Sequence, residues 1–220
     1  MVKNVKFFSQ VDLESGIASL AVFLFGEGEV KTSFLGEERV VHLKEEGVRE
    51  DYYILEIKLW EGMAPYLYPY FVEDKEYRIG LRSLGLDEKR GFFLNGRRYP
   101  LDGNNSLVTD DLSLLDSCDE EGIVVSFIFP FGHVPTEEEI CQLSSHPSVF
   151  FWGYRIEGEK EEDMRKLNSI LYSLDKTRAT MGVFEMDYFC PKVFDVTLKR
   201  EKSEEEKGVV ALFDGKGFEL

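Results

Sequence analysis

The chain has few of the features that mark a membrane protein or a nucleic-acid-binding protein. Acidic residues outnumber basic ones 42 to 26, giving a formal net charge of −16, which repels phosphate backbones and anionic lipid heads. No stretch approaches the ~20 consecutive apolar residues that a membrane span needs, and the N-terminus has no long apolar segment of a secretory signal. We therefore expect no nucleic-acid partner, no membrane partner and a cytoplasmic location.

Cysteine and histidine are also sparse. The 3 cysteines, at positions 118, 141 and 190, show no paired spacing, and we expect them to be small buried side chains. The 3 histidines, at positions 42, 133 and 146, are scattered, so the sequence predicts no metal site, and His146 more plausibly orients the start of a strand before Pro147. No glycine-rich phosphate cradle and no Gly-x-Ser-x-Gly turn occurs, so we expect no cofactor and no nucleophilic serine.

The residues that are abundant favour a packed, strand-rich fold. Hydrophobic residues make up 43% of the 220 positions and aromatic residues 14%, enough for a packed core. From Val2 to about Leu84, short alternating runs are separated by glycines at roughly ten-residue spacing. This pattern is typical of an antiparallel β-sandwich.

After Leu86 the pattern changes to an alternation of helices and apolar strands. Asn95-Gly96 predicts a two-residue hairpin turn within Phe92–Leu101, and Asp214-Gly215 suggests another near the end. The helices are expected over Leu112–Glu121, with Gly122 as C-cap, over Thr136–Leu143, with Thr136 as N-cap, and over Glu161–Leu174. The strands are expected over Ile123–Phe131, Ser148–Tyr154, Thr180–Glu185 and Val193–Leu198. Helices alternating with buried strands indicate a parallel α/β layer.

Three segments carry a resemblance to a known family: Leu59-Trp60 with Pro65-Tyr66-Leu67-Tyr68, then YRIGLRSLGLDEKRGFFLNGRRYPLDGNN (77–105), and HPSVFFWGYRIEG (146–158). In this order they resemble segments of glycoside hydrolase family 2, the β-galactosidases and β-glucuronidases. The resemblance implies an immunoglobulin-like antiparallel β-sandwich over 1–85, with Trp60, Tyr66 and Tyr68 in its core. A partial, TIM-barrel-like (β/α) parallel layer would follow over 86–220, because a complete barrel takes about 250 residues.

The same resemblance assigns candidate site residues. Glu157 stands at the position of the family's acid/base glutamate, and Asn105 is retained from a sugar-binding segment. Trp152 belongs to an aromatic cluster that could stack on a sugar. Ile156 replaces the asparagine that holds the sugar 2-hydroxyl, and phenylalanines at 127 and 129 occupy a strand that carries acidic residues in the family. We find no counterpart of the nucleophile strand before Leu220, so we expect impaired or absent catalysis.

Several functions stay open at this point. The chain could be a minimal glycosidase that pairs Glu157 with an acid such as Glu185, Asp187 or Asp195, since a retaining mechanism needs two carboxyl groups. It could instead be a non-catalytic carbohydrate-binding or interaction module, with Glu157 only a solvated residue in an acidic stretch, or one piece of a split glycosidase. The expected partners are a carbohydrate and either a second copy or a complementing chain, which would cover the unpaired edges of a partial barrel.

Overall fold

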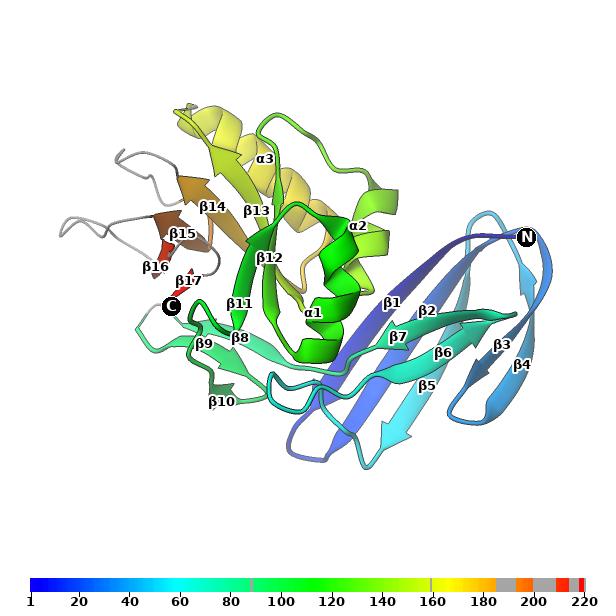
Figure 1. Cartoon of the computed structure of the whole chain (residues 1–220). Helices are drawn as coiled ribbons and strands as arrows, with labels where there is room; N and C mark the ends of the chain where they lie inside the picture. Colours follow the sequence, from blue (N-terminus) through cyan, green and yellow to red (C-terminus); the bar gives the residue numbers. More distant parts are fainter. Residues whose placement is uncertain (88, 159, 185–192, 200–208, 214–217, 220) are drawn as a thin grey trace.

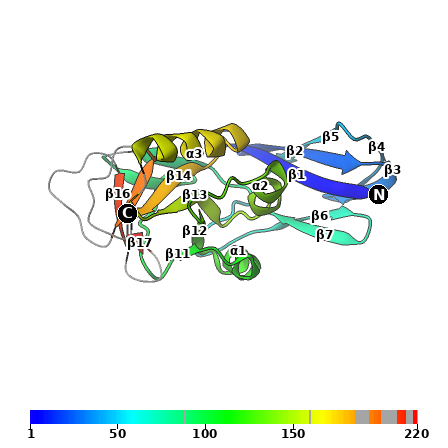
Figure 2. The ribbon, with the colours of Figure 1, turned by 90° about the horizontal axis from the view of Figure 1, so that it is seen from above.

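The fold consists of an antiparallel half and a parallel half that lie end to end (Figure 1). The computed structural model describes residues 1–87, 89–158, 160–184, 193–199, 209–213 and 218–219. Figure 2 shows α3 lying along one face of the parallel sheet, over β13 and β14. No helix in these described ranges is long and apolar enough to cross a membrane.

The antiparallel half is the predicted sandwich, built from two sheets with strand orders β1-β2-β5 and β4-β3-β6-β7. Its strands are β1 (Val2–Asp12), β2 (Ile17–Gly26), β3 (Gly28–Phe34), β4 (Glu37–Leu43), β5 (Val48–Leu55), β6 (Tyr68–Val72) and β7 (Lys75–Ile79). Side chains of β5 alternate strictly between buried and outward positions, as expected for a strand with one face on a core. The buried faces of both sheets form one continuous apolar cluster.

A small antiparallel sheet joins the two halves. It contains β8 (Leu84–Asp87), β9 (Gly91–Leu94) and β10 (Arg97–Arg98). The predicted hairpin is confirmed: Leu94 pairs with Arg97, and Asn95 and Gly96 have φ angles of 52° and 76°. Two consecutive positive φ angles give the turn whose twist matches that of paired strands.

The second half contains the predicted parallel sheet, with strand order β11-β12-β13-β14-β15-β16-β17. Its strands are β11 (Ser106–Thr109), β12 (Val124–Phe129), β13 (Val149–Ile156), β14 (Ala179–Phe184), β15 (Val196–Lys199), β16 (Val209–Phe213) and β17 (Phe218–Glu219). Every neighbouring pair from β11 to β16 is parallel, and β17 is antiparallel to β16. The sheet curls until its edge strands, β11 and β17, bring Cα atoms within 8 Å of each other. Near the C-terminus, β16 pairs in parallel with β15 and so extends the sheet.

The helices follow the predicted signals. A 3₁₀ turn, η1 (Leu112–Leu114), leads into α1 (Leu115–Glu121), which ends at Gly122 with φ +74°. α2 (Glu137–Ser144) begins with a capping box between Thr136 and Glu139, and α3 spans Glu161–Leu174 as expected. Thus the local signals for helix ends, which need few neighbours, are correct in this chain.

Some sequence expectations are wrong in position. Trp60 is fully buried, but it packs with the joining sheet and the parallel sheet rather than in the sandwich core, and Tyr66 is 36% exposed. Tyr68 does lie in the sandwich core.

The strand expected from Val193 begins only at Val196, because the Asp195 side chain accepts hydrogen bonds from Thr180 instead of extending the ladder. The turn expected at Asp214-Gly215 lies outside the described residues.

The two faces of the parallel sheet have different neighbours. One face packs against the helices in a cluster that includes Val125, Trp152 and Leu167. The other face packs against the joining sheet, through residues such as Val124 and Phe151. We call these the helix side and the inner side. Because side chains alternate along a strand, the inner side of β13 carries positions 151, 153 and 155.

Candidate functional site

The candidate site lies at the carboxyl end of the parallel sheet. Asp110, Pro130 and Glu157 follow the last residues of β11, β12 and β13. Because these strands are parallel, the three residues meet at one edge. They line a cavity of about 400 Å³, whose walls are Asp110, Ile128, Phe129, Pro130, Phe131, Arg155 and Glu157.

Strand alternation places the polar groups of this cavity on the inner side. Arg155 and Glu157 continue the inner-side series of Phe151 and Gly153, and Asp110 continues that of Val108, which packs against the inner cluster. The cavity therefore opens where a parallel α/β barrel normally presents its functional side chains.

The floor of the cavity is apolar. Gly153 has no side chain, and a Cβ added there would lie 2.3 Å from Cδ1 of Ile128. The glycine thus gives Ile128 room to fill the inner side beneath Arg155. The rim above this floor is polar, since Asp110, Arg155 and Glu157 are all exposed.

This arrangement can bind and polarise a hydroxylated ligand. Two carboxylates, Asp110 and Glu157, accept hydrogen bonds, and the Arg155 guanidinium donates them. Carboxyl groups facing one cavity also form the minimal set for acid and base chemistry on a glycosidic bond. Sequence reasoning identified Glu157 but missed Asp110, because Ser106–Thr109 was too short a run to be recognised as a strand.

Trp152, proposed from the sequence as a sugar platform, is fully buried on the helix side. Its Nε1 donates to Oδ2 of Asp175 at 3.1 Å, and the Arg178 guanidinium lies 5.2 Å from the ring centroid. Neither face of the indole is available to a ligand. The structure gives Trp152 a packing role.

Asn105 lies just before β11, at the amino end of the sheet and away from Glu157. Its Oδ1 accepts a hydrogen bond from the backbone N–H of Asp102, and its Nδ2 donates to the carbonyl of Pro100, both at 2.9 Å. The amide therefore holds the loop that leads into β11. This placement does not support the sugar-binding role expected for Asn105.

Of the three acids considered as partners of Glu157, the structure describes only Asp195, which it does not bring to Glu157. Asp195 precedes β15 and accepts a hydrogen bond from the Thr180 N–H at 2.8 Å, at the amino end of β14. Four residues of strand, about 13 Å, separate Thr180 from Phe184, which pairs with Ile156 beside Glu157. Glu185 and Asp187 lie outside the described residues.

The phenylalanines of β12 do not fill the sugar-facing side, contrary to the sequence expectation. Phe127 and Phe129 belong to the helix-side cluster, and Ile128, between them, faces the inner side. The expected loss of acidic groups from this strand still holds, since the strand Val124–Phe129 contains no acidic residue.

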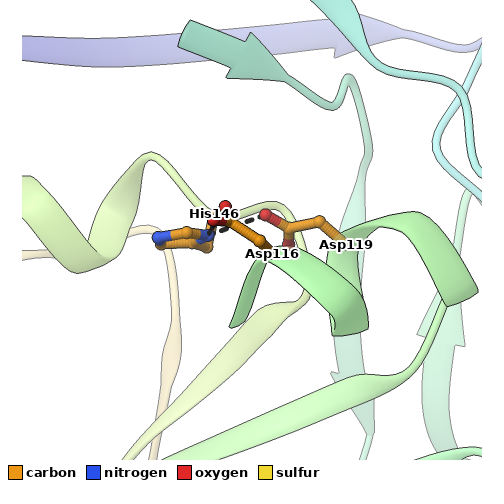
Figure 3. A group of neighbouring side chains, drawn as sticks. All are labelled: Asp116, Asp119 and His146. Carbon is orange, nitrogen blue, oxygen red and sulfur yellow. Dashed lines mark hydrogen bonds and ion pairs between the residues drawn. The ribbon is translucent and has the colours of Figure 1, made fainter. Parts of the chain in front are cut away.

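A second titratable group lies on the opposite edge, at the amino end of β13 (Figure 3). Asp116, Asp119 and His146 place one ligand atom each within 4.8 Å of one another. Nδ1 of His146 lies 2.7 Å from Oδ2 of Asp119, and Oδ1 of Asp119 accepts the Ser148 N–H at 2.9 Å. Both oxygens of Asp119 are thus used by the chain itself. These contacts of Asp119 with His146 and Ser148, which we call the Asp119 clamp, orient the start of β13, as expected for His146.

The Asp119 clamp also reaches the sandwich side of the molecule. The carbonyl of Asp119 accepts a hydrogen bond from Nε1 of Trp60 at 2.9 Å. One acidic residue therefore ties α1 to the loop before β13 and to the segment between β5 and β6. The two buried cysteines, Cys118 and Cys141, are free thiols, as expected, and Cys190 lies outside the described residues.

Sequence comparison finds β-galactosidases. No family model matches the chain. The β-galactosidase of Thermoanaerobacterium thermosulfurigenes is 25% identical over an alignment of 185 residues, which covers 58% of this chain and 26% of the relative. The β-galactosidase of Thermoanaerobacter pseudethanolicus is 25% identical over 182 residues, covering 56% and 24%. The chain thus spans about a quarter of the length of these relatives.

Structure comparison finds β-glucuronidases. The apo structure of Bacteroides uniformis β-glucuronidase 3 matches with a TM-score of 0.74 and 18% identity, covering 90% of this chain and 34% of that one. The β-D-glucuronidase of Dictyoglomus thermophilum matches with a TM-score of 0.70 and 18% identity, covering 90% and 47%. At this identity the likeness shows the fold: antiparallel sheets followed by a parallel sheet with few helices.

Proposed function

Because the chain is distantly related to the β-galactosidases and β-glucuronidases of glycoside hydrolase family 2, over part of those chains, we propose that it binds β-glycosides and hydrolyses them weakly or not at all. The binding site is the cavity at the carboxyl end of the parallel sheet. One observation carries this proposal: Glu157, the acid/base position by resemblance, lines this cavity together with Asp110 and Arg155.

Two apolar residues near Glu157, Ile156 and Ile128, support weak hydrolysis. Ile156 is 2% exposed and packs on the helix side, so the position before the glutamate offers a sugar no hydrogen bond. Ile128 gives the β12 wall an apolar group. General acid catalysis alone supplies about 10²- to 10⁴-fold, far less than a complete glycosidase site provides.

Any residual hydrolysis would use the two carboxyl groups that the cavity contains. Protonated Glu157 would donate its proton to the glycosidic oxygen as the C–O bond breaks. Asp110 would either attack the anomeric carbon or remove a proton from an attacking water, depending on the separation of the carboxyl groups. In the second case, the water oxygen forms the new bond to carbon and its proton passes to Asp110.

The test measures binding and hydrolysis separately on the purified protein. The protein is titrated in a calorimeter with an aryl β-galactoside and, separately, with an aryl β-glucuronide. We expect saturable binding of at least one of them. Asp110→Asn and Glu157→Gln should weaken it about tenfold, since each removes a charge-assisted hydrogen bond. Glu162→Gln, an exposed change in the first turn of α3, is the matched control.

Two outcomes decide between the parts of the proposal. Absence of saturable binding to both glycosides contradicts the binding function. Turnover of about 1 to 10³ s⁻¹ that is lost in Glu157→Gln contradicts weak catalysis and shows a complete active site. Sedimentation of the same preparation tests the further proposal that a second copy or a complementing chain covers the edges of the sheet.

A further inference from the structure

A second cavity lies between the two halves, at the amino end of the parallel sheet. It has a volume of about 230 Å³, and its walls come from β1, the segment after β7, the end of α2 and the loop between α3 and β14. It is therefore separate from the cavity of Glu157, which lies at the carboxyl end.

The walls of this cavity carry more positive than negative charge. Three basic residues line it, Lys6, Arg82 and Arg178, and Asp175 is the one acid among its lining residues. This balance is opposite to that of the whole chain, whose formal net charge is −16. A local excess of cations in an acidic protein needs an explanation.

Arg178 and Asp175 already satisfy each other. Nη1 of Arg178 lies 2.7 Å from Oδ2 of Asp175, and the two side chains are only 6% and 5% exposed. The remaining nitrogens of Arg178 donate to the carbonyls of Val149 and Ser144, at 2.7 and 2.8 Å. This pair is complete and leaves no charge for a third group.

Arg82 has no such partner. Its Nη2 donates to the carbonyl of Val149 at 2.8 Å, and its guanidinium stacks 4.9 Å from the ring centroid of Phe150. Its Nε is buried with no hydrogen-bond acceptor, and no carboxylate in the described part of the chain forms an ion pair with it. A water molecule could accept from Nε but would leave the charge unbalanced.

The surroundings of Arg82 disfavour an isolated cation. Burial, followed by the charge of Arg178, lowers the pKa of Arg82 well below its usual range and outweighs the opposite effect of the Asp119 and Asp175 charges. An arginine side chain nevertheless stays protonated in proteins, so the cavity contains a buried positive charge without an ion-pair partner among the described residues. An anion beside Arg82 would neutralise this charge.

Lys6 adds a second cation to the same wall. Its side chain is 13% exposed, and its Nζ lies 3.3 Å from Oε1 of Glu137, which is 72% exposed. An ion pair with so exposed a carboxylate is weak, so Lys6 can turn toward an anion at small cost.

We propose that this cavity binds a small oxyanion, carried on a phosphate or a carboxylate, with Arg82 as its main ligand and Lys6 as its second. The unpaired Nε lies beside Nη2, which donates one N–H to Val149 and has a second N–H, and two such neighbouring donors form the fork that arginine uses for two-oxygen recognition of such groups. The volume of about 230 Å³ suits an anion of a few heavy atoms, below the usual range for larger ligands. A ligand there would contact both halves.

The experiment titrates the protein with inorganic phosphate and, separately, with acetate, at low ionic strength and with chloride as the reference salt. We expect saturable one-to-one binding of at least one anion, with a Kd of about 1 mM or below. Arg82→Gln should weaken it at least tenfold, because the variant keeps length and polarity but loses the charge. Arg90→Gln, which changes an arginine that is 72% exposed and does not line the cavity, should leave binding unchanged.

Two further variants keep the proposal open to failure. If Arg82→Gln does not fold, Arg82→Lys, which keeps the charge without the fork, should weaken binding by a smaller factor. Glu157→Gln should not affect anion binding, so failure of the glycoside proposal stays distinguishable. The proposal would be overturned if phosphate and acetate stabilise the protein against unfolding no more than chloride does. It would also be overturned if anion binding survives in Arg82→Gln.

Discussion

The two ends of the parallel sheet use the same kinds of residue for different purposes. At the amino end, Asp119 and Asp175 are 3% and 6% exposed, and each has hydrogen-bond donors on both oxygens. At the carboxyl end, Asp110 and Glu157 are exposed and line a cavity. Burial with full pairing makes an acid part of the fold, whereas an exposed acid that lines a cavity can contact a ligand.

This contrast follows from how the chain enters and leaves each strand. Loops at the amino end carry the chain from helices into strands and are packed against the sandwich and the joining sheet, for example through Trp60. At the carboxyl end, the first residues after β11 and β13, Asp110 and Glu157, are exposed. The ends therefore differ in the free energy that a substitution should cost, and the following changes test that difference.

The largest effect should come from Asp175→Ala at the amino end. The change removes the partner of Arg178, whose side chain is 6% exposed, and leaves a buried charge unpaired, which costs about 3 to 5 kcal/mol. Urea unfolding measures it. A double variant that also carries Arg178→Met should recover part of the loss, because no charge then remains buried. A loss below about 1 kcal/mol in Asp175→Ala would show that the pair contributes little.

The same pair predicts a dependence on pH. Burial raises the pKa of Asp175, but the Arg178 charge and the hydrogen bonds from Thr177 outweigh it and lower the pKa from 3.8 to about 2. A carboxyl group with a depressed folded pKa stabilises the fold above its unfolded pKa, and this stabilisation is lost as the pH falls through 3.8 toward 2. The difference corresponds to about 2 kcal/mol.

Comparison with Asp175→Asn isolates this contribution from that of other carboxyl groups. The stability advantage of the native chain over the variant should shrink by about 2 kcal/mol when the pH is lowered from about 5 to about 2. An advantage that stays constant over this interval would mean that Asp175 does not titrate with the depressed pKa.

The sequence alone could predict those features that depend on neighbours along the chain. α3 spans Glu161–Leu174 as predicted because its apolar spacing and acidic first turn are local, and Asn95-Gly96 specifies its own turn. β11 was missed because four residues, Ser106–Thr109, are too few to show a period. Asp110 was lost with it, since its position at the sheet edge depends on that strand.

The positions of the candidate sugar-binding residues were less predictable for a related reason. The sequence identified an apolar strand around Trp152 but not which side of the sheet each residue faces. The indole points to the helix side, where Asp175 accepts its N–H. Asn105 is similar: its short hydrogen bonds to the loop at Pro100 and Asp102 are set by the fold. Glu157 was identified only through the resemblance of residues 146–158 to a family segment, because the strand expected from the sequence ended at Tyr154.

A smaller effect is expected at the start of α2, in the loop that returns from the carboxyl end. Oγ1 of Thr136 accepts the Glu139 N–H, and Glu139 accepts the Thr136 N–H in return. Thr136→Ala removes half of this capping box and should cost about 1 kcal/mol. Thr136→Ser, which keeps the hydroxyl, should cost much less. Equal losses in the two variants would show that the hydroxyl hydrogen bond is not the cause.

The smallest effect on stability should come from Glu157→Gln, at the carboxyl end. The side chain is exposed, and interactions of exposed carboxylates contribute about 0 to 1 kcal/mol, so urea unfolding should change by less than about 1 kcal/mol. Its effect on glycoside binding should be the larger one, the reverse of the expectation for Asp175→Ala. A stability loss of about 3 kcal/mol, as at a buried amino-end acid, would place Glu157 among the residues that hold the fold together and remove it from the candidate site.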